Sequence, residues 1–138
     1  MLIEKRSAKL LGDLNLVYKQ NANIGFLING HSLAKGYGED FFKFLKSSLK
    51  YLDGKKILEI GCGGCYLLEK LKKLNYDVYG IDPSPFAIKM GNKKKIKIIK
   101  DFYPSKKISF LFDLIFHVDV LEHIPDPLLL LKEHYKNL

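Results

Sequence analysis

Between positions 39 and 138, apolar residues recur along the chain with two alternating spacings. Phe42, Leu45 and Leu49 return every three or four positions, which is typical of an amphipathic helix. Residues 56–60 contain a short apolar run before a glycine, which is typical of a buried strand. These patterns predict helices at 39–52, 65–74, 85–91 and 127–135, and strands at 56–60, 76–81, 95–100 and 112–117.

The order of these elements predicts an α/β fold with a doubly wound, parallel sheet. Strands separated by helical segments pair in parallel through right-handed crossovers, and such sheets bind nucleotides at the ends of their strands. Residues 1–38 are less regular: a short helix is expected at 10–18, and several asparagines and glycines interrupt the pattern between residues 21 and 38. We therefore expect an N-terminal segment at 1–38 that covers a ligand site, and one domain at 39–138.

A glycine-rich turn joins the first predicted strand to the following helix. Glycine permits the sharp change of direction, and the absence of side chains at Gly61 and Gly63 lets a ligand approach the backbone. The N-terminus of the helix offers unpaired N–H groups. Asp82 ends the next strand 21 residues after Gly61, close to the ~20 residues of one βαβ step, where a carboxylate can accept hydrogen bonds from ribose hydroxyls.

Three strings occur in order across about residues 39–138: E-I-G-C-G-G-C, Y-G-I-D-P-S and F-D-L-I-F-H-V-D-V-L-E-H-I-P-D-P. Together they resemble class I S-adenosylmethionine-dependent methyltransferases of the ubiquinone- and menaquinone-biosynthesis type. The resemblance implies a Rossmann-like sheet in strand order 3-2-1-4, with S-adenosylmethionine as cofactor and S-adenosylhomocysteine as product. It implies methyl transfer by in-line displacement, in which the protein mainly positions the reactants.

The resemblance also assigns cofactor contacts residue by residue. Expected against the methionine and ribose parts are Glu59, Gly61, Cys62 and Gly63, with Asp82 on the ribose hydroxyls. Expected around the adenine are Pro83, Asp101 and the backbone of Phe102, and expected at the methionine end are His117 and Val118. No catalytic base and no metal ligand are assigned. The acidic and histidine side chains at 117–123 are expected to serve packing and capping.

Two features depart from the family pattern. Cys65 stands where the family has a third glycine, which predicts looser packing of the following helix. The family sheet continues with about three more strands, which carry part of the substrate site, whereas this chain ends at Leu138. An open edge beside the fourth strand would expose hydrogen-bonding groups. We expect a fragment of a longer protein; a partner or a second copy of the chain at that edge are the alternatives.

Other functions remain open at this point. Cys62 and Cys65 form a C-x-x-C motif, which suits thiol–disulfide exchange. A nicotinamide-dependent dehydrogenase would share the glycine turn, but Tyr66 stands where its fingerprint needs glycine. A cofactor-binding module without catalytic activity, serving as a subunit of a larger methyltransferase, is the main rival. No segment identifies the methyl acceptor.

The charge and composition change this picture little. The net charge is +8, and much of it lies in short lysine clusters such as 93–95. Solvated faces explain these clusters better than nucleic acid, because no aromatic residues interleave with them to stack bases; nucleic acid is not excluded. No apolar run approaches the ~20 residues that span a bilayer, and no signal peptide is evident. A cytoplasmic protein without membrane association is expected.

Overall fold

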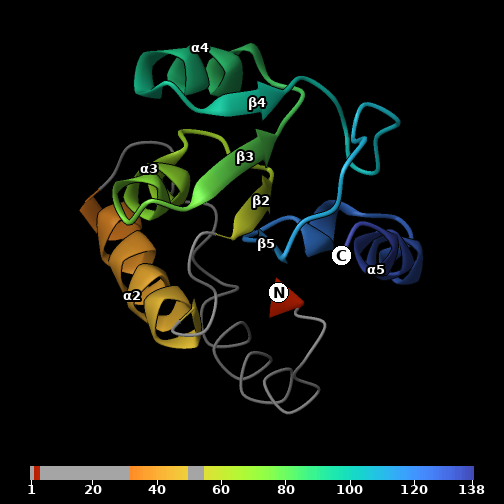
Figure 1. Ribbon diagram of the computed structural model, residues 1–138, viewed down its shortest axis with the longest axis horizontal. Helices are drawn as coiled ribbons and strands as arrows, with labels where there is room; N and C mark the ends of the chain where they lie inside the picture. The colour runs from red at the N-terminus through yellow and green to blue at the C-terminus, as the bar shows by residue number, and fades with distance from the viewer. Residues whose placement is uncertain (1, 4–31, 50–54) are drawn as a thin grey trace.

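A computed structural model describes residues 2–3, 32–49 and 55–138 of the chain (Figure 1). Its centre is a five-stranded sheet in the order β1-β5-β2-β3-β4. The strands are β1 (Leu2–Ile3), β2 (Lys56–Ile60), β3 (Asp77–Ile81), β4 (Lys97–Ile99) and β5 (Leu114–His117). The helices are α2 (Ser32–Ser48), α3 (Tyr66–Lys73), α4 (Pro85–Lys94) and α5 (Pro127–Lys136), with a 3-10 turn, η3, at Leu121–His123.

The four strands β4, β3, β2 and β5 are parallel to their neighbours. This is the predicted 3-2-1-4 order, and helices cover both faces, so the doubly wound α/β fold is confirmed. Side chains alternate between the two faces, as strand geometry requires. In β2, Ile57 packs with α2, α3 and α4, whereas Leu58 and Ile60 pack on the other face with Leu130 of α5. In Figure 1, α2 and α3 lie on one side of the sheet and α5 lies on the other.

The first described helix differs from its prediction. The sequence pattern predicts it at 39–52, but α2 spans Ser32–Ser48 and crosses the boundary placed at residue 38. The interpretation of Gly36 and Gly38 as helix breakers is therefore wrong. A Cβ at Gly38 would lie 2.6 Å from Cε1 of Tyr66, so the glycine lets α3 approach α2 closely. The helix predicted at 10–18 lies outside the described residues.

The predicted end of α4 at residue 91 is also wrong. The helix continues to Lys94, and Lys95 ends it in a left-handed conformation with φ of 55°. Gly91 serves packing instead, because a Cβ there would overlap Cγ1 of Ile98 in β4 and lie 3.1 Å from the carbonyl oxygen of Ile96. The helix therefore rests directly on the edge strand at this glycine.

Gly91→Ala is expected to destabilise the protein although alanine favours helices. Overpacking of this kind costs about 1–3 kcal/mol, and the higher helix propensity of alanine returns about 1 kcal/mol. Urea unfolding should therefore show a net loss of about 1 kcal/mol, and of at most about 2 kcal/mol. Asn92→Ala, at the next and exposed position, is the control and should not lose stability. A Gly91→Ala protein as stable as this control would contradict the packing role.

The sheet edge beside β5 is not fully open. β1 pairs with it in antiparallel fashion, with Leu2 opposite Phe116 and Ile3 opposite Ile115. Residues from the start of the chain therefore occupy part of the edge that we expected to be open. Because β1 has only two residues, the covering is short.

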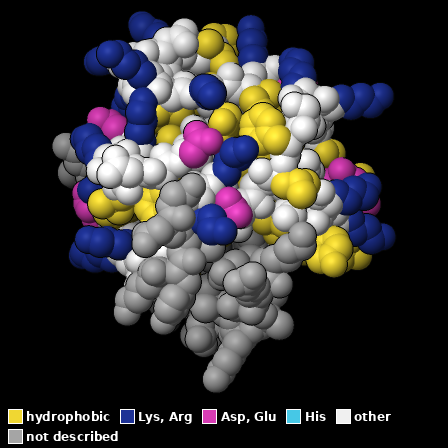
Figure 2. All heavy atoms as spheres, in the orientation of Figure 1, with side chains coloured by type: hydrophobic (Ala, Val, Ile, Leu, Met, Phe, Trp, Pro, Cys, Tyr) yellow, Lys and Arg dark blue, Asp and Glu magenta, His cyan; other side chains and the backbone are white. Residues whose placement is uncertain are grey.

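Lysine side chains are distributed over the visible face rather than gathered in one patch (Figure 2). Several pair with nearby carboxylates, among them Lys55 with Asp113 and Lys107 with Asp101. This agrees with the interpretation of solvated faces. Of the helices in the described ranges, none is both long and apolar enough to cross a membrane.

Candidate functional site

The predicted site residues follow the carboxyl ends of four neighbouring parallel strands. Gly61–Gly63 follow β2, Asp82 and Pro83 follow β3, Asp101 and Phe102 follow β4, and Val118 follows His117 at the end of β5. The chain leaves β2 toward β3 and β4 and then returns to place β5 on the other side of β2. Such a reversal of strand order creates a crevice at the carboxyl edge of the sheet, where ligands bind.

The turn after β2 needs glycine at two positions for different reasons. Gly61 has φ of 70°, and a Cβ there would lie 2.6 Å from Cγ2 of Val120. Gly63 has φ of 43°, but no described atom lies within 4 Å of the position its Cβ would take. Gly61 is therefore required by the protein's own packing, whereas the space beside Gly63 is open to a ligand.

Asp82 ties the turn to the end of β3. Its carboxylate is buried, and its two oxygens accept hydrogen bonds from the backbone N–H groups of Gly63, at 2.9 Å, and Ser84, at 2.8 Å. Ser84 in turn begins α4, since its hydroxyl accepts a hydrogen bond from the N–H of Ala87. Each carboxylate oxygen has two lone pairs, so one further acceptor position remains on each oxygen of Asp82.

Glu59 lies in β2 directly below the turn and is 6% exposed. Within the described part of the chain, no donor forms a hydrogen bond with its buried Oε2. Burial raises the pKa of this carboxyl well above its ordinary value, and the nearby Cys65 and Asp82 add to the increase. A buried carboxyl without a full set of partners is costly to the fold, which marks Glu59 as a functional candidate.

The C-x-x-C motif is buried. Cys62 and Cys65 are free thiols, 5% and 0% exposed. Their mutual contact, together with burial, raises the pKa of Cys62 above the ordinary value of a thiol, and the same contact lowers the pKa of Cys65, whose side chain is fully enclosed. A Cβ at Gly80 would lie 2.5 Å from the Cys62 sulfur, so this thiol packs directly on the backbone of β3. Reactive thiols are partly exposed thiolates, and this pair is built as core, which argues against the redox alternative.

Cys65 occupies the position of the family's third glycine with the backbone that glycine would adopt. Its φ is 55°, in the left-handed region, and it stands as the N-cap of α3. A non-glycine residue in this conformation costs about 1–2 kcal/mol. The expected looseness of α3 is not observed, because Leu67, Leu68 and Leu71 are all buried.

The residues after β4 form hydrogen bonds with one another within their own loop. One oxygen of Asp101 accepts the N–H of Phe102 at 2.9 Å, and the other accepts the Ser105 hydroxyl at 2.8 Å. These bonds, that of Ser105 first, lower the pKa of Asp101. The Phe102 N–H that we expected to face the adenine therefore donates to Asp101, while the Phe102 ring is 73% exposed.

His117 ends β5 and Val118 follows it, and both side chains pack into the protein interior. His117 is fully buried, with its ring centroid 5.5 Å from that of His134 in α5. Burial lowers the pKa of His117 to about 2, so its ring is neutral. Val118 packs on the other face of the sheet, against the hydrophobic cluster that includes residues of α2, α3 and α4. A cofactor contact at these two positions would therefore be made through the main chain.

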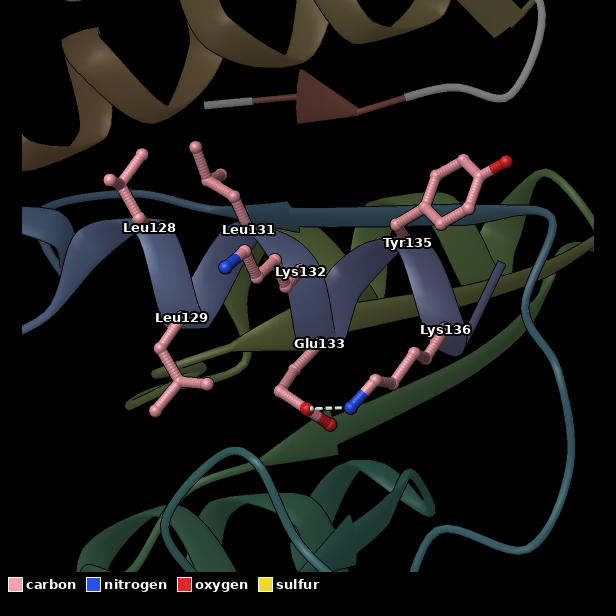
Figure 3. A pocket seen from close by; sticks show the side chains of 7 residues that line it. All are labelled: Leu128, Leu129, Leu131, Lys132, Glu133, Tyr135 and Lys136. Atoms are coloured by element: carbon pink, nitrogen blue, oxygen red, sulfur yellow. Dashed lines mark hydrogen bonds and ion pairs between the residues drawn. The ribbon is translucent and has the colours of Figure 1, made fainter.

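A hollow of about 500 Å³ lies elsewhere, along the outer surface of α5 (Figure 3). Leucines and Tyr135 line it, with Leu128, Leu131 and Tyr135 projecting to the same side. None of its lining residues follows a strand end, so this hollow is separate from the candidate site.

Sequence reasoning missed Lys94. This residue ends α4, yet its ammonium group donates to the carbonyl oxygens of Gly64, at 2.8 Å, and Cys65, at 3.4 Å. In the sequence it stands between two other lysines, and nothing in the pattern distinguishes it from them.

Residues 37–138 match a family model described as a methyltransferase domain. The mitochondrial ubiquinone biosynthesis O-methyltransferase of Schizosaccharomyces pombe is 31% identical over a 97-residue alignment, which covers 64% of this chain and 35% of the relative. The ubiquinone biosynthesis O-methyltransferase of Pelagibacter ubique is 35% identical over 100 residues, 68% of this chain and 42% of the relative. The chain thus spans less than half the length of these curated relatives.

Solved structures share the fold. The plantazolicin methyltransferase, solved with S-adenosylhomocysteine, gives a TM-score of 0.58 at 24% identity. The matched region covers 97% of this chain and 50% of the chain of that structure. The magnesium protoporphyrin IX methyltransferase of Synechocystis PCC 6803, solved with bound S-adenosylmethionine, also gives 0.58 at 20% identity, with coverages of 82% and 64%.

Proposed function

Because this chain belongs to the methyltransferase-domain family, whose members use S-adenosylmethionine, we propose that it binds this cofactor at the carboxyl edge of its sheet. The observation that carries the proposal is the turn around Gly63. There an open backbone surface lies beside a buried carboxylate, Asp82, and above a second buried carboxyl, Glu59. These are the groups that a nucleoside carrying an amino acid requires.

The residues present fit the cofactor. A side chain at position 63 would fill the open space, and the left-handed backbone there already excludes most residues. The Oε2 atom of Glu59 is a buried acceptor that a ligand donor could satisfy. We infer that Asp82 accepts the ribose hydroxyls through the lone pairs its two backbone bonds leave unused, with Pro83 beside the adenine.

When bound, S-adenosylmethionine supplies a methyl group already activated by a sulfonium. The chain's own residues hold the cofactor so that this carbon faces an acceptor, since position and orientation carry much of the catalysis in such a displacement. The backbone at His117 and Val118 borders the methionine end. The acceptor is a hydroxyl group by analogy with the O-methyltransferase relatives.

A second candidate is a cofactor-binding module without its own transferase activity. The two candidates share the cofactor site and differ in whether the chain alone turns over an acceptor.

The proposal is tested by isothermal titration with S-adenosylmethionine and S-adenosylhomocysteine, with NAD as a control ligand. The wild type should bind both adenosyl ligands and not NAD. Asp82→Ala should weaken binding by about 100-fold or more, since two hydrogen bonds to a charged acceptor are lost. Asp77→Ala, at the opposite and exposed end of the same strand, is the matched control and should bind as the wild type does.

Thermal unfolding of each variant shows that it is folded at the titration temperature. A folded wild type that binds neither adenosyl ligand would contradict the proposal, and so would equal affinities of the two aspartate variants. Once binding is established, methyl transfer from labelled S-adenosylmethionine to a panel of small molecules with hydroxyl groups separates the enzyme from the module.

A further inference from the structure

Lys94 is an unusual lysine for its place in the chain. Its side chain is only 16% exposed, whereas its neighbours Lys93 and Lys95 are both exposed to solvent. The ammonium group makes an ion pair with Oε2 of Glu69 at 2.8 Å, besides its bonds to the carbonyl oxygens of Gly64 and Cys65. A lysine is rarely buried unless it is paired, and here all three partners belong to the glycine turn or to the first turn of α3.

These bonds connect the ammonium group to Asp82 through the peptide units of the turn. The Gly64 carbonyl and the Cys65 N–H belong to one planar peptide unit, and this N–H donates to the Cys62 carbonyl at 2.7 Å. The Cys62 carbonyl shares the next planar unit with the Gly63 N–H, which donates to Asp82. Lys94 thus fixes one end of a continuous series of bonds whose other end is the carboxylate of the cofactor site.

We propose that Lys94 is a positioning residue of the cofactor site: its ammonium group orients the peptide units between Cys62 and Cys65, and through them Gly63 and Asp82. The inference rests on the proposed function, because the site it orients is the proposed site for S-adenosylmethionine. Lys94 donates no hydrogen bond to Gly63 or Asp82, so it reaches them through the turn. Its charge also acts directly on Glu59, whose pKa it lowers against the larger effect of burial.

The placement of this cation agrees with a positioning role better than with general stabilisation. A positive charge beside the N-terminus of a helix opposes the helix dipole, and Lys94 lies against the first residues of α3. Glu69 offsets part of this cost. The charge orients the carbonyl groups of Gly64 and Cys65. The turn they belong to contains two residues with positive φ, Gly63 and Cys65.

The test compares Lys94→Met, which keeps the length of the side chain, with Lys94→Arg and with Lys93→Met, an exposed control on the same helix. Isothermal titration with S-adenosylhomocysteine should show binding weakened by about 10-fold or more in Lys94→Met, since bonds from a charged donor are lost. Lys94→Arg should retain most of the affinity, because a guanidinium group can donate to several carbonyls. Lys93→Met should bind as the wild type does.

Amide hydrogen exchange measured by NMR supplies a readout that needs no ligand. In Lys94→Met, the amides of Gly63 and Cys65 should exchange about 10-fold faster or more, beyond any change at Leu58 in β2, which reports global unfolding. Equal acceleration at all three amides would mean a purely structural role and would overturn the inference. So would binding by Lys94→Met within twofold of the wild type.

These outcomes separate the two proposals. If the wild type binds no adenosyl ligand, the proposed function fails, and the exchange data still decide whether Lys94 orients the turn. If the wild type binds and Lys94→Met binds equally well, only the positioning role fails.

Discussion

Replacing Glu59 with glutamine is expected to make the protein more stable at pH 7 and at the same time to weaken its binding of S-adenosylmethionine. Glu59 is buried, and burial raises its pKa, followed by the effects of Cys65 and Asp82. The unfolded chain ionises this carboxyl above its ordinary pKa, whereas the folded protein retains the proton. Folding stability is therefore lost as the pH rises from the unfolded pKa toward the folded one.

Glutamine has nearly the same shape and never ionises, so the variant avoids this loss. We expect a gain of about 1–3 kcal/mol at pH 7, measured by urea unfolding, and a smaller gain near pH 4.5, the ordinary pKa of the carboxyl. Binding should move in the opposite direction. Oε2 has no hydrogen-bond partner among the described residues, and we infer that a bound ligand donates to it and favours the ionised carboxylate. A glutamine offers one acceptor oxygen where an ionised Glu59 offers two, so titration should show affinity reduced by about 10-fold or more.

Glu122→Gln, at an exposed position in η3, is the matched control and should change neither quantity. A Glu59→Gln protein that binds as well as the wild type would remove Glu59 from the site. A Glu59→Gln protein that is less stable than the wild type at pH 7 would show that an interaction of the carboxyl stabilises the fold by more than its burial destabilises it.

The parts of the fold that the sequence predicts well are those marked by a local pattern of a few residues. The strands at Lys56–Ile60 and Asp77–Ile81 match within one residue, because buried parallel strands are nearly continuous apolar runs. The turn at Gly61–Gly63 is predicted equally well, since two positive φ values so close together favour glycine at both positions. At Gly63 the missing side chain also leaves the open space that the proposed cofactor would use.

The features that the sequence does not reveal depend on contacts between distant residues. Gly38 and Gly91 look like helix ends, but each sits within a helix to admit a neighbour, Tyr66 in one case and Ile98 in the other. Lys94 belongs to a run of lysines, and only the fold shows which one turns inward. His134 lies in a terminal helix beside charged residues yet is fully buried. No local pattern marks such contacts.

The burial of His134 leads to a second large effect. Lowering the pH from 7 to 5 should destabilise Glu59→Gln by about 3–4 kcal/mol, because two buried histidines resist protonation. Burial lowers the pKa of His117 to about 2 and that of His134 to about 4. In the unfolded chain both take up protons near pH 6.5, so stability is present above that pH and is lost as the pH falls toward the folded pKa values.

The Glu59→Gln background matters because Glu59 has the opposite dependence on pH and would mask part of the loss in the wild type. His134 is neutral with a defined tautomer, since its Nδ1–H donates to the Leu130 carbonyl oxygen at 2.6 Å. Its ring also packs edge-on against Tyr103, at 5.0 Å between centroids. In this background, His134→Phe keeps the ring contact and should halve the loss between pH 7 and 5, to about 2 kcal/mol.

Urea unfolding at pH 7, 6 and 5 measures these losses, and the range stops at pH 5 because paired carboxylates begin to lose their partners below it. His123→Leu in the same background is the matched control, since it also removes one histidine, but an exposed one in η3. If His134→Phe and His123→Leu showed the same dependence, proton uptake by the buried pair would not be its cause. A Glu59→Gln protein equally stable at pH 7 and 5 would mean that both rings take up protons in the folded state, and thus that water reaches the core between β5 and α5.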